Sequence, residues 1–453
     1  MSDYYNDALA AKSKLATVSD SFCLAKWKQV SLHLTTGHTN SCYHPPLHRI
    51  PVGPLLDNPS ALHNTAHKKK SRADMIAGTK CTDCNYCWNI EAQNNMSDRH
   101  YRSGEEWAMD SFDDIVNNPT ADVNPSYVEV NFNNVCNLAC SYCSPQYSST
   151  WTTEANTHGA WPTQVPHNDP SYFQGERKAI PNKDPNPYRE AFWRWWPDLY
   201  KDLKHFRMTG GEPTMDPNTY KVFDYVLANP KKDLHLNTTS NFSVDDRVWS
   251  KYKGHVQRLC EGEQIEHFMQ FVSIDTWGKQ AEYIRHGLNF DKAINRCEEF
   301  IRDIPHRSSL TFIITMNNLG ILNLQKLLEY ILYLRKTYTT DYQRIWFDTP
   351  LLYTPEWQSI QILPDSYTMY MQQCIDFMNA NLDEMQGFKD YEVLKMQRDL
   401  DWMRSGTVDI ERKRADFYRF FSEHDRRRKT NFLETFPEMQ TFWQECENNA
   451  QAH

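Results

Sequence analysis

The sequence contains no run of eighteen apolar residues, and its first seven residues, Met-Ser-Asp-Tyr-Tyr-Asn-Asp, include neither a basic cluster nor an apolar stretch. The first absence argues against a membrane-spanning helix. The second argues against a secretory signal peptide. We therefore expect a cytoplasmic protein in a reducing compartment, where cysteines bind metals more often than they form disulfides.

An excess of positive charge is also missing. The 453 residues include 49 lysines and arginines against 58 aspartates and glutamates, which gives a formal net charge of −9. This balance argues against a broad nucleic-acid-binding surface. Two local basic runs, Lys68-Lys69-Lys70 and Arg426-Arg427-Arg428-Lys429, are predicted to be solvated faces rather than RNA contacts.

Cysteine is present but unevenly distributed, with eight of the twelve cysteines before residue 144. These eight form two sets, which are Cys136, Cys140 and Cys143 in one and Cys23, Cys42, Cys81, Cys84 and Cys87 in the other. The remaining four stand alone and are predicted to be small buried core residues: Cys260, Cys297, Cys374 and Cys446. We therefore expect the first third of the chain to contain the metal sites.

From about residue 125 the sequence alternates short β-like runs with helical patterns, which is typical of βα units and a parallel sheet. Six strands are predicted, at 127–132, 205–208, 234–240, 268–274, 310–315 and 345–347. Helical patterns lie between them at 220–228, 290–301 and 324–334. We predict an α/β fold, a partial TIM-like (β/α)6 barrel with its sites at the C-terminal ends of the strands.

Three parts are expected along the chain. Residues 1–115 are predicted to form an N-terminal Cys-rich module, residues 116–352 the barrel, and residues 353–453 a C-terminal helical layer. Within the barrel, residues 152–190 contain six prolines and are predicted to be a long loop. A lid or substrate-facing role and a plain surface excursion are both open for this loop.

Cys136, Cys140 and Cys143 are separated by three and two residues. Closely spaced thiolates are ligands of iron–sulfur clusters, and three of them on a four-iron cluster leave one iron open for chemistry. This pattern, with Tyr142 before the last cysteine, resembles the signature of the radical S-adenosylmethionine (SAM) superfamily. The resemblance implies that the three cysteines hold a 4Fe-4S cluster and that SAM binds its open iron. It further implies reductive cleavage of SAM to a 5′-deoxyadenosyl radical, which abstracts a hydrogen from a substrate.

Two further motifs follow the first predicted strands in the order that this family shows. Gly210-Gly211-Glu212-Pro213 resembles the family's GGE motif, and the resemblance implies that Gly210, Gly211 and Glu212 hold the SAM amino group. Ser240 and Asn241, after the third strand, match the position that contacts the SAM ribose. A plain turn is an equal alternative for this Ser-Asn pair.

Ser273 and Asp275 end the fourth predicted strand, and Arg285 follows twelve residues after Ser273. This spacing resembles the Ser-x-Asp…Arg arrangement of sulfatase-maturing and related peptide-modifying radical SAM enzymes. The resemblance implies that Ser273 and Arg285 meet the SAM carboxylate, a role that suits a guanidinium fork. An arginine on a surface helix is the alternative.

The second set of cysteines combines a Cys-x13-Gly-x4-Cys spacing, from Cys23 to Cys42, with Cys81-Thr-Asp-Cys84-Asn-Tyr-Cys87. It resembles the SPASM and twitch modules, which implies an auxiliary 4Fe-4S cluster, and five thiols are closer to twitch. A Glu-x5-Ser-x-Arg pattern typical of twitch-domain proteins follows, as Glu91, Ser97 and Arg99. From spacing alone a zinc site is an equal alternative. Which four of the five cysteines bind is open.

The resemblance implies a radical SAM oxidoreductase or maturase with reduced flavodoxin or ferredoxin as its electron donor. A peptide or protein is the leading substrate class, with a small sugar or nucleotide derivative as the alternative. Asp348, just after the sixth predicted strand, is predicted to take a proton during substrate oxidation. A non-enzymatic zinc or iron–sulfur protein is the second hypothesis, which leaves the GGE motif and the Ser273-to-Arg285 spacing unexplained. Neither a membrane nor a nucleic acid is expected as a partner.

Overall fold

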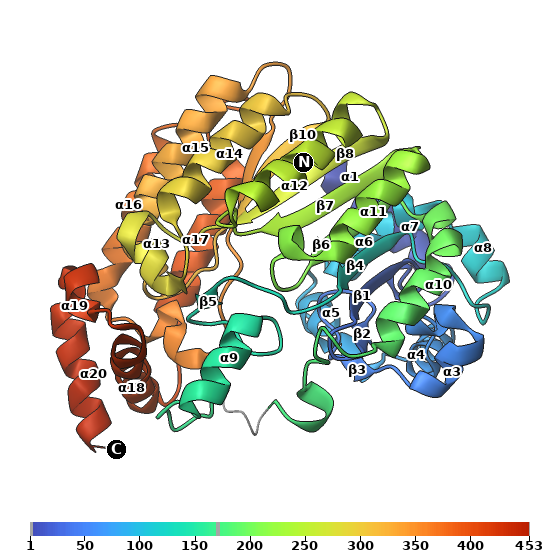
Figure 1. Cartoon of the computed structure of the whole chain (residues 1–453). Coiled ribbons are helices and arrows are strands. Elements are labelled where there is room, and N and C mark those ends of the chain that lie inside the picture. Colours follow the sequence, from blue (N-terminus) through green and yellow to red (C-terminus); the bar gives the residue numbers. More distant parts are fainter. Residues whose placement is uncertain (1–2, 169–172, 453) are drawn as a thin grey trace. The chain divides into compact units, whose positions relative to one another are not determined.

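The structure, a computed structural model, describes residues 3–168 and 173–452 (Figure 1). It divides into two compact units, and each unit combines separate stretches of the chain. Unit 1 consists of Met1–Asn133, Ile180–Gly210 and Lys232–Asn237, and unit 2 of Asn134–Ala179, Gly211–Lys231 and Thr238–His453. Among the described residues, no helix combines the length and the apolar character that a membrane span requires.

Unit 1 is built on parallel strands with an antiparallel extension. Strand β1 (Gln29–His33) pairs in parallel with β4 (Tyr127–Asn131), which pairs in parallel with β6 (His205–Thr209). Along the other edge of β1, β2 (His38–Asn40) and β3 (His48–Arg49) run antiparallel. The first part of β7 (Lys231–Ser240) lies next to β6.

Aromatic and aliphatic side chains form a core beneath the first helices of unit 1. Phe22, Trp27, Trp107 and Phe112 are buried there together with Cys81 and Cys87. The helices of this unit are α1 (Asp3–Ala16), α2 (Ala25–Lys28), α3 (Val52–Asp57), α4 (Ala66–Ile76), α5 (Asn85–Glu91), α6 (Asp98–Gly104), α7 (Glu106–Met109), α8 (Phe112–Asn117) and α10 (Pro187–Asp202).

Unit 2 contains the last part of β7 and three parallel strands, β8 (Ile265–Ser273), β10 (Ser308–Ile313) and β11 (Ile345–Asp348). Helices α12 (Asp246–Glu261), α14 (Phe290–Asp303) and α15 (Leu324–Tyr338) pack on these strands (Figure 1). In α15 the apolar residues Leu327, Leu328 and Ile331 are buried on one face, as the sequence predicts.

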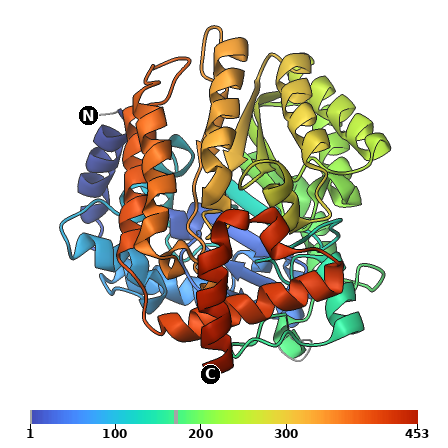
Figure 2. The same ribbon diagram turned by 90° about the vertical axis from the view of Figure 1, so that its left-hand side faces the viewer.

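A two-residue pairing in unit 2 is decisive for the site. Strand β5 (Ala139–Cys140) pairs antiparallel with β9 (Arg285–His286), and this register sets Cys140 opposite Arg285. The other helices of the unit are α9 (Ser149–His158), α11 (Pro217–Ala228), α13 (Gly278–Ile284), α16 (Thr368–Asn379), α17 (Asp390–Arg404), α18 (Ile410–Arg428), α19 (Phe432–Thr435) and α20 (Gln440–Ala452). Figure 2 shows the C-terminal helices in red, where α18 packs against α20.

All six predicted strands are confirmed, and the pairings of β4 with β6 and of β8 with β10 and β11 are parallel. The helical character of the C-terminal region is confirmed as well. Closure of the strands into a partial barrel stays a prediction, because they are divided between the two units. So does the three-part division at residues 115 and 352.

The predicted loop at 152–190 is too long at both ends. Helix α9 occupies 149–158, and α10 begins at Pro187. Ser148 caps α9 by accepting a hydrogen bond from the Trp151 amide, and Gly159, at φ 76°, ends the helix. Within the irregular stretch, residues 169–172 lie outside the described part of the chain.

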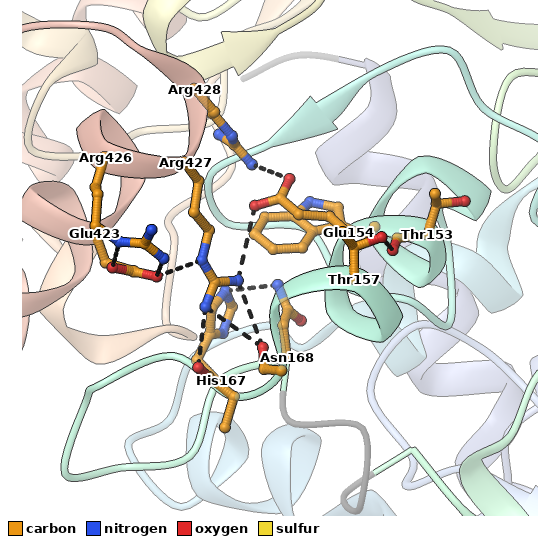
Figure 3. A network of polar contacts seen from close by, with 12 residues as sticks. Thr153, Glu154, Thr157, His167, Asn168, Glu423, Arg426, Arg427 and Arg428 are labelled. Atoms are coloured by element: carbon orange, nitrogen blue, oxygen red, sulfur yellow. Dashed lines mark hydrogen bonds and ion pairs between the residues drawn. The ribbon is translucent and has the colours of Figure 1, made fainter.

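The prediction that the basic runs are solvated faces is wrong for three residues. Lys68 is buried and donates to Thr39 Oγ1 at 2.9 Å. The side chains of Arg427 and Arg428 are 1% and 3% exposed. Nearby carboxylates and aromatic rings compensate both guanidinium charges (Figure 3), which a run of like charges in the sequence does not reveal. By contrast, the prediction that Cys260, Cys297, Cys374 and Cys446 are buried is confirmed.

Candidate functional site

The loop that contains Cys136, Cys140 and Cys143 is fixed by the start of helix α9. Ser148 Oγ donates to the Leu138 carbonyl at 2.7 Å, and Trp151 Nε1 donates to the Cys140 carbonyl at 2.8 Å. Both bonds are made to main-chain atoms. The three thiols are therefore left available as ligands.

Each of these thiols is free, and burial raises the pKa of each. For Cys143 the pKa rises to about 12. At Cys140 the positive charge of Arg285 opposes this effect, because its Nη1 lies 3.6 Å from the sulfur. In the part of the chain that the structure describes, no three His, Cys, Asp or Glu side chains converge on a position for a single metal ion.

The glycines of the predicted GGE motif permit a close approach of two chain segments. A Cβ atom on Gly211 would lie 2.2 Å from the Val135 carbonyl oxygen, so a side chain cannot fit there. The Glu212 amide donates to the same carbonyl at 2.6 Å. Gly211 and Glu212 thus pack directly against the residue that precedes Cys136. Gly210, at φ 116°, adopts a backbone conformation that favours glycine.

The Glu212 carboxylate is buried and accepts four hydrogen bonds. Oε1 accepts from the Thr214 amide, the Thr214 hydroxyl and Ser240 Oγ at 2.7 Å. Oε2 accepts from the Asn241 amide at 2.8 Å. Burial raises the pKa of Glu212, and these hydrogen bonds to the charged form oppose the rise. Asn241 also donates to Asn137 Oδ1 in the cysteine loop at 2.9 Å.

A second buried cluster also adjoins the cysteine loop. Arg285 donates two hydrogen bonds to Asp275, from Nε to Oδ2 at 2.9 Å and from Nη2 to Oδ1 at 2.7 Å. The Tyr142 hydroxyl donates to Asp275 Oδ2 at 2.7 Å. The carboxylate therefore joins Tyr142 to Arg285, and Arg285 adjoins Cys140.

The structure does not bring every predicted residue into these clusters. Ser273 lies at the end of β8 and is partly exposed. Asp348 lies at the end of β11, where its carboxylate pairs with Lys395 of α17, and its side chain is 49% exposed. Its role in proton transfer stays a prediction.

Three contributors were missed from the sequence. Asn168 donates to the Cys143 carbonyl at 2.9 Å, and Gln358 accepts from Ser141 Oγ at 2.7 Å. Both are distant in sequence from the cysteines, and no local signal marks them. Thr214, which binds Glu212 twice, could have been found, because a hydroxyl two residues after a carboxylate commonly closes a short turn.

The second set of cysteines lies in unit 1. Cys23, Cys42, Cys84 and Cys87 line one cavity together with basic side chains that include Lys26. Cys81 lies behind Cys84, with 3.4 Å between their sulfurs. The cavity has a volume of about 30 Å³ in this structure.

The predicted Glu-x5-Ser-x-Arg residues come together beside this cavity. Arg99 donates to Glu91 through Nε at 2.9 Å and Nη2 at 2.8 Å, and Ser97 Oγ donates to Glu91 Oε1 at 2.5 Å. Arg99 also donates to the Phe22 carbonyl at 2.8 Å. The triad thereby ties the segment after Cys87 to the residue before Cys23.

No family model and no curated protein matches the chain. Among solved structures, SuiB from Streptococcus suis bound to S-adenosylmethionine is 11% identical with a TM-score of 0.36, and the match covers 70% of this chain and 60% of SuiB. SuiB bound to the precursor peptide SuiA is 11% identical with a TM-score of 0.34, and the match covers 68% of this chain and 52% of SuiB. SuiB alone is 11% identical with a TM-score of 0.35, and that match covers 80% of this chain and 69% of SuiB. The chain thus spans about 60% of SuiB in the first of these structures. At these scores the similarity assigns no activity to this chain.

Proposed function

We propose that this chain is a radical SAM enzyme. The observation that carries the proposal is the convergence of two buried polar clusters on one three-cysteine loop. The Glu212 amide donates to Val135 and its partner Asn241 donates to Asn137, both in the loop, and Arg285 adjoins the loop through Cys140. A scaffold that only bound a structural metal would need the thiols but neither of these clusters.

The donor set fits a 4Fe-4S cluster with one open iron, since Cys136, Cys140 and Cys143 are free thiols on one loop and no fourth cysteine joins them there. When bound, such a cluster and SAM supply a 5′-deoxyadenosyl radical that abstracts a substrate hydrogen. The guanidinium of Arg285 stabilises the thiolate form of Cys140 by its charge.

Glu212 can hold the ammonium group of SAM. Its Oε2 accepts one hydrogen bond, from Asn241, and a carboxylate oxygen has capacity for a second. Gly211 keeps the backbone against Val135, which precedes Cys136, so Glu212 would lie near a cluster held by the cysteine loop. Ser240 holds the carboxylate in place by donating to Oε1, and its contact with the SAM ribose stays a prediction.

We also propose that Cys23, Cys42, Cys84 and Cys87 hold an auxiliary cluster, with Cys81 outside the ligand set. The four thiols share a cavity, and the neighbouring Lys26, Arg99 and Arg102 would compensate the negative charge of a thiolate-ligated cluster. A peptide is the proposed substrate, on the resemblance of Ser273, Asp275 and Arg285 to peptide-modifying enzymes.

Anaerobic reconstitution with iron and sulfide tests the proposal. The wild-type chain should bind about eight irons, which corresponds to two four-iron clusters. With dithionite it should convert SAM to 5′-deoxyadenosine. Cys140→Ala should reduce the iron content to about four and abolish 5′-deoxyadenosine formation.

Two matched variants control for the loss of a thiol as such. Cys260→Ala removes an isolated buried cysteine, and Cys81→Ser removes the fifth cysteine of unit 1. Both should keep about eight irons. Full SAM cleavage by Cys140→Ala, or bound zinc without any 5′-deoxyadenosine in the wild type, contradicts the enzyme proposal.

A further inference from the structure

Unit 1 contains one cysteine more than the proposed auxiliary cluster uses. In that proposal Cys84 is a ligand and Cys81 is not, yet their sulfurs lie 3.4 Å apart. Both are free thiols. The proposed function therefore leaves Cys81, a thiol in contact with a ligand, without a role.

The main chain holds Cys81 and Cys84 at a separation that suits a disulfide. Cys81 is the N-cap of a short 3₁₀ helix (Thr82–Cys84), and the Cys84 amide donates to the Cys81 carbonyl at 3.2 Å. Three residues advance such a helix by about 6 Å, and the Cα atoms of disulfides lie roughly 4.4–6.8 Å apart. The Cys81 carbonyl also accepts from Trp88 Nε1 at 2.8 Å, which fixes this end of the turn. The two sulfurs can therefore be joined without a rearrangement of the backbone.

The sequence offers a second Cys-x-x-Cys pair, which is Cys84 with Cys87. Cys87 lies in helix α5 and lines the same cavity as Cys84. The sulfur contact of 3.4 Å favours Cys81 over Cys87 as the partner of Cys84. The structure thus makes a choice between two pairs that are equivalent in spacing.

Cys84 is the member of the pair that a small oxidant reaches. It is half-buried and lines the cavity, whose wall also includes Asp98, with a side chain that is 44% exposed. Cys81 is buried. An oxidant therefore meets Cys84 first, and Cys81 is in place to react with the product.

We propose that Cys81 and Cys84 form a reversible disulfide when the chain without its auxiliary cluster meets a peroxide. Cys84 Sγ first attacks one peroxide oxygen, the O–O bond breaks, and the departing hydroxide takes up a proton to become water. Cys81 Sγ then attacks the sulfenic sulfur of Cys84, so that an S–S bond forms and the S–O bond breaks. The second hydroxide leaves as water with the proton of Cys81. The two thiols thus supply the two electrons that reduce the peroxide.

The value of this disulfide to the auxiliary cluster rests on the proposed function, in which Cys84 is a ligand. A sulfenic acid without a thiol partner is oxidised further to a sulfinic acid, which thiols do not reverse. A disulfide is reduced again by thiol–disulfide exchange. Cys81 therefore preserves Cys84 as a ligand until a cluster is inserted.

Peptide mapping of the purified, iron-free chain tests the proposal. The chain is treated with hydrogen peroxide, the remaining thiols are alkylated, and trypsin cleaves after Lys80 and Arg99 to release residues 81–99. In this peptide we expect alkylation of Cys87 alone and, by fragmentation, a bond between Cys81 and Cys84. Treatment with dithiothreitol before alkylation should remove the bond and allow all three cysteines to be alkylated.

Cys81→Ser removes the second thiol of the pair and keeps the four proposed ligands. After the same peroxide treatment, Cys84 should be recovered as a sulfinic acid that dithiothreitol does not reverse. Cys87→Ser is the matched control, because it removes the other Cys-x-x-Cys partner of Cys84. In that variant the bond between Cys81 and Cys84 should form as in wild type.

The wild-type map alone overturns the proposal if Cys84 stays reduced, becomes a sulfinic acid or bonds to Cys87. Equal recovery of reduced Cys84 from wild type and Cys81→Ser overturns it as well. The mapping requires no iron, so its failure leaves the proposed auxiliary cluster in place. Conversely, a reconstituted wild-type chain with only about four irons removes the auxiliary cluster and leaves the disulfide.

Discussion

At the scale of single residues, the carboxylate of Glu212 is the most constrained group of the candidate site. It is buried, and main-chain amides and hydroxyls surround it. All of these partners are hydrogen-bond donors, so both terminal atoms of the side chain at this position must be acceptors. A carboxylate meets this requirement and an amide does not.

Glu212→Gln should therefore destabilise the protein by about 2 kcal/mol, because the new NH2 group would face a donor. Urea unfolding measures the effect, and the affinity for SAM should fall in the same variant. Glu261→Gln, at an exposed carboxylate on α12, is the control and should leave both quantities unchanged. Equal stability of the two variants would show that Glu212 is not held as its contacts indicate.

The residue scale also shows what sequence reasoning cannot supply. The spacing of Ser273 and Arg285 predicts that the arginine meets a ligand, but not that it binds the Asp275 side chain. The contact of Arg285 with Cys140 depends on β9 lying against β5, and these segments are about 145 residues apart. Local patterns carry no record of such a contact.

At the scale of elements, helix α9 supports the cysteine loop from one side. Ser148 is both its N-cap and a donor to the Leu138 carbonyl. One hydroxyl thus joins the helix start to the loop. The sequence predicts a loop where this helix lies, because the threonines and the histidine of the segment have low helix propensity. In the folded chain, tertiary contacts override that preference.

Ser148→Ala should destabilise the protein by about 1 kcal/mol through loss of the cap. Amide hydrogen exchange should accelerate between Leu138 and Trp151, where the second hydrogen bond is also lost. Thr153→Ala, on the exposed face of the same helix, is the control. Unchanged exchange in the loop of Ser148→Ala would disprove the coupling between α9 and the cysteines.

Strand prediction from the sequence is correct where buried and partly exposed residues alternate along the chain. In β6, Phe206 and Met208 are buried while their neighbours are partly exposed, and the sequence shows the same alternation. Strand β1 was missed, although it pairs with β4 along its whole length. Its residues lie within the segment that the cysteine spacing assigns to a metal-binding module, between Cys23 and Cys42.

At the scale of the whole molecule, both compact units bury histidines without charging them. In unit 2 burial lowers the pKa of His167 and of His424 to about 3. In unit 1 it lowers the pKa of His33 to about 4 and that of His205 to about 3. In the unfolded chain each histidine titrates near pH 6.5.

Stability should therefore fall as the pH drops below about 6.5, because the unfolded state then binds protons that the folded state excludes. Each such histidine should cost about 1 kcal/mol at pH 5.5. Above pH 7 these groups are neutral in both states and should contribute no pH dependence. Thermal melts between pH 5 and 8 measure the trend.

A pair of variants isolates the contribution of one histidine. His424→Phe, among the rings of Tyr283, Phe420 and Phe421, should flatten the acid limb of the stability curve. His306→Gln, at an exposed position, should leave the curve as in wild type. An identical acid limb in all three proteins would rule out buried histidine as the cause.

The hydrogen bonds that fix the cysteine loop connect main-chain carbonyls to Ser148, Trp151 and Asn168. None of them depends on a sulfur atom. The shape of this loop therefore rests on hydrogen bonds between protein groups alone. Under the proposed function, insertion of a cluster would follow folding rather than drive it.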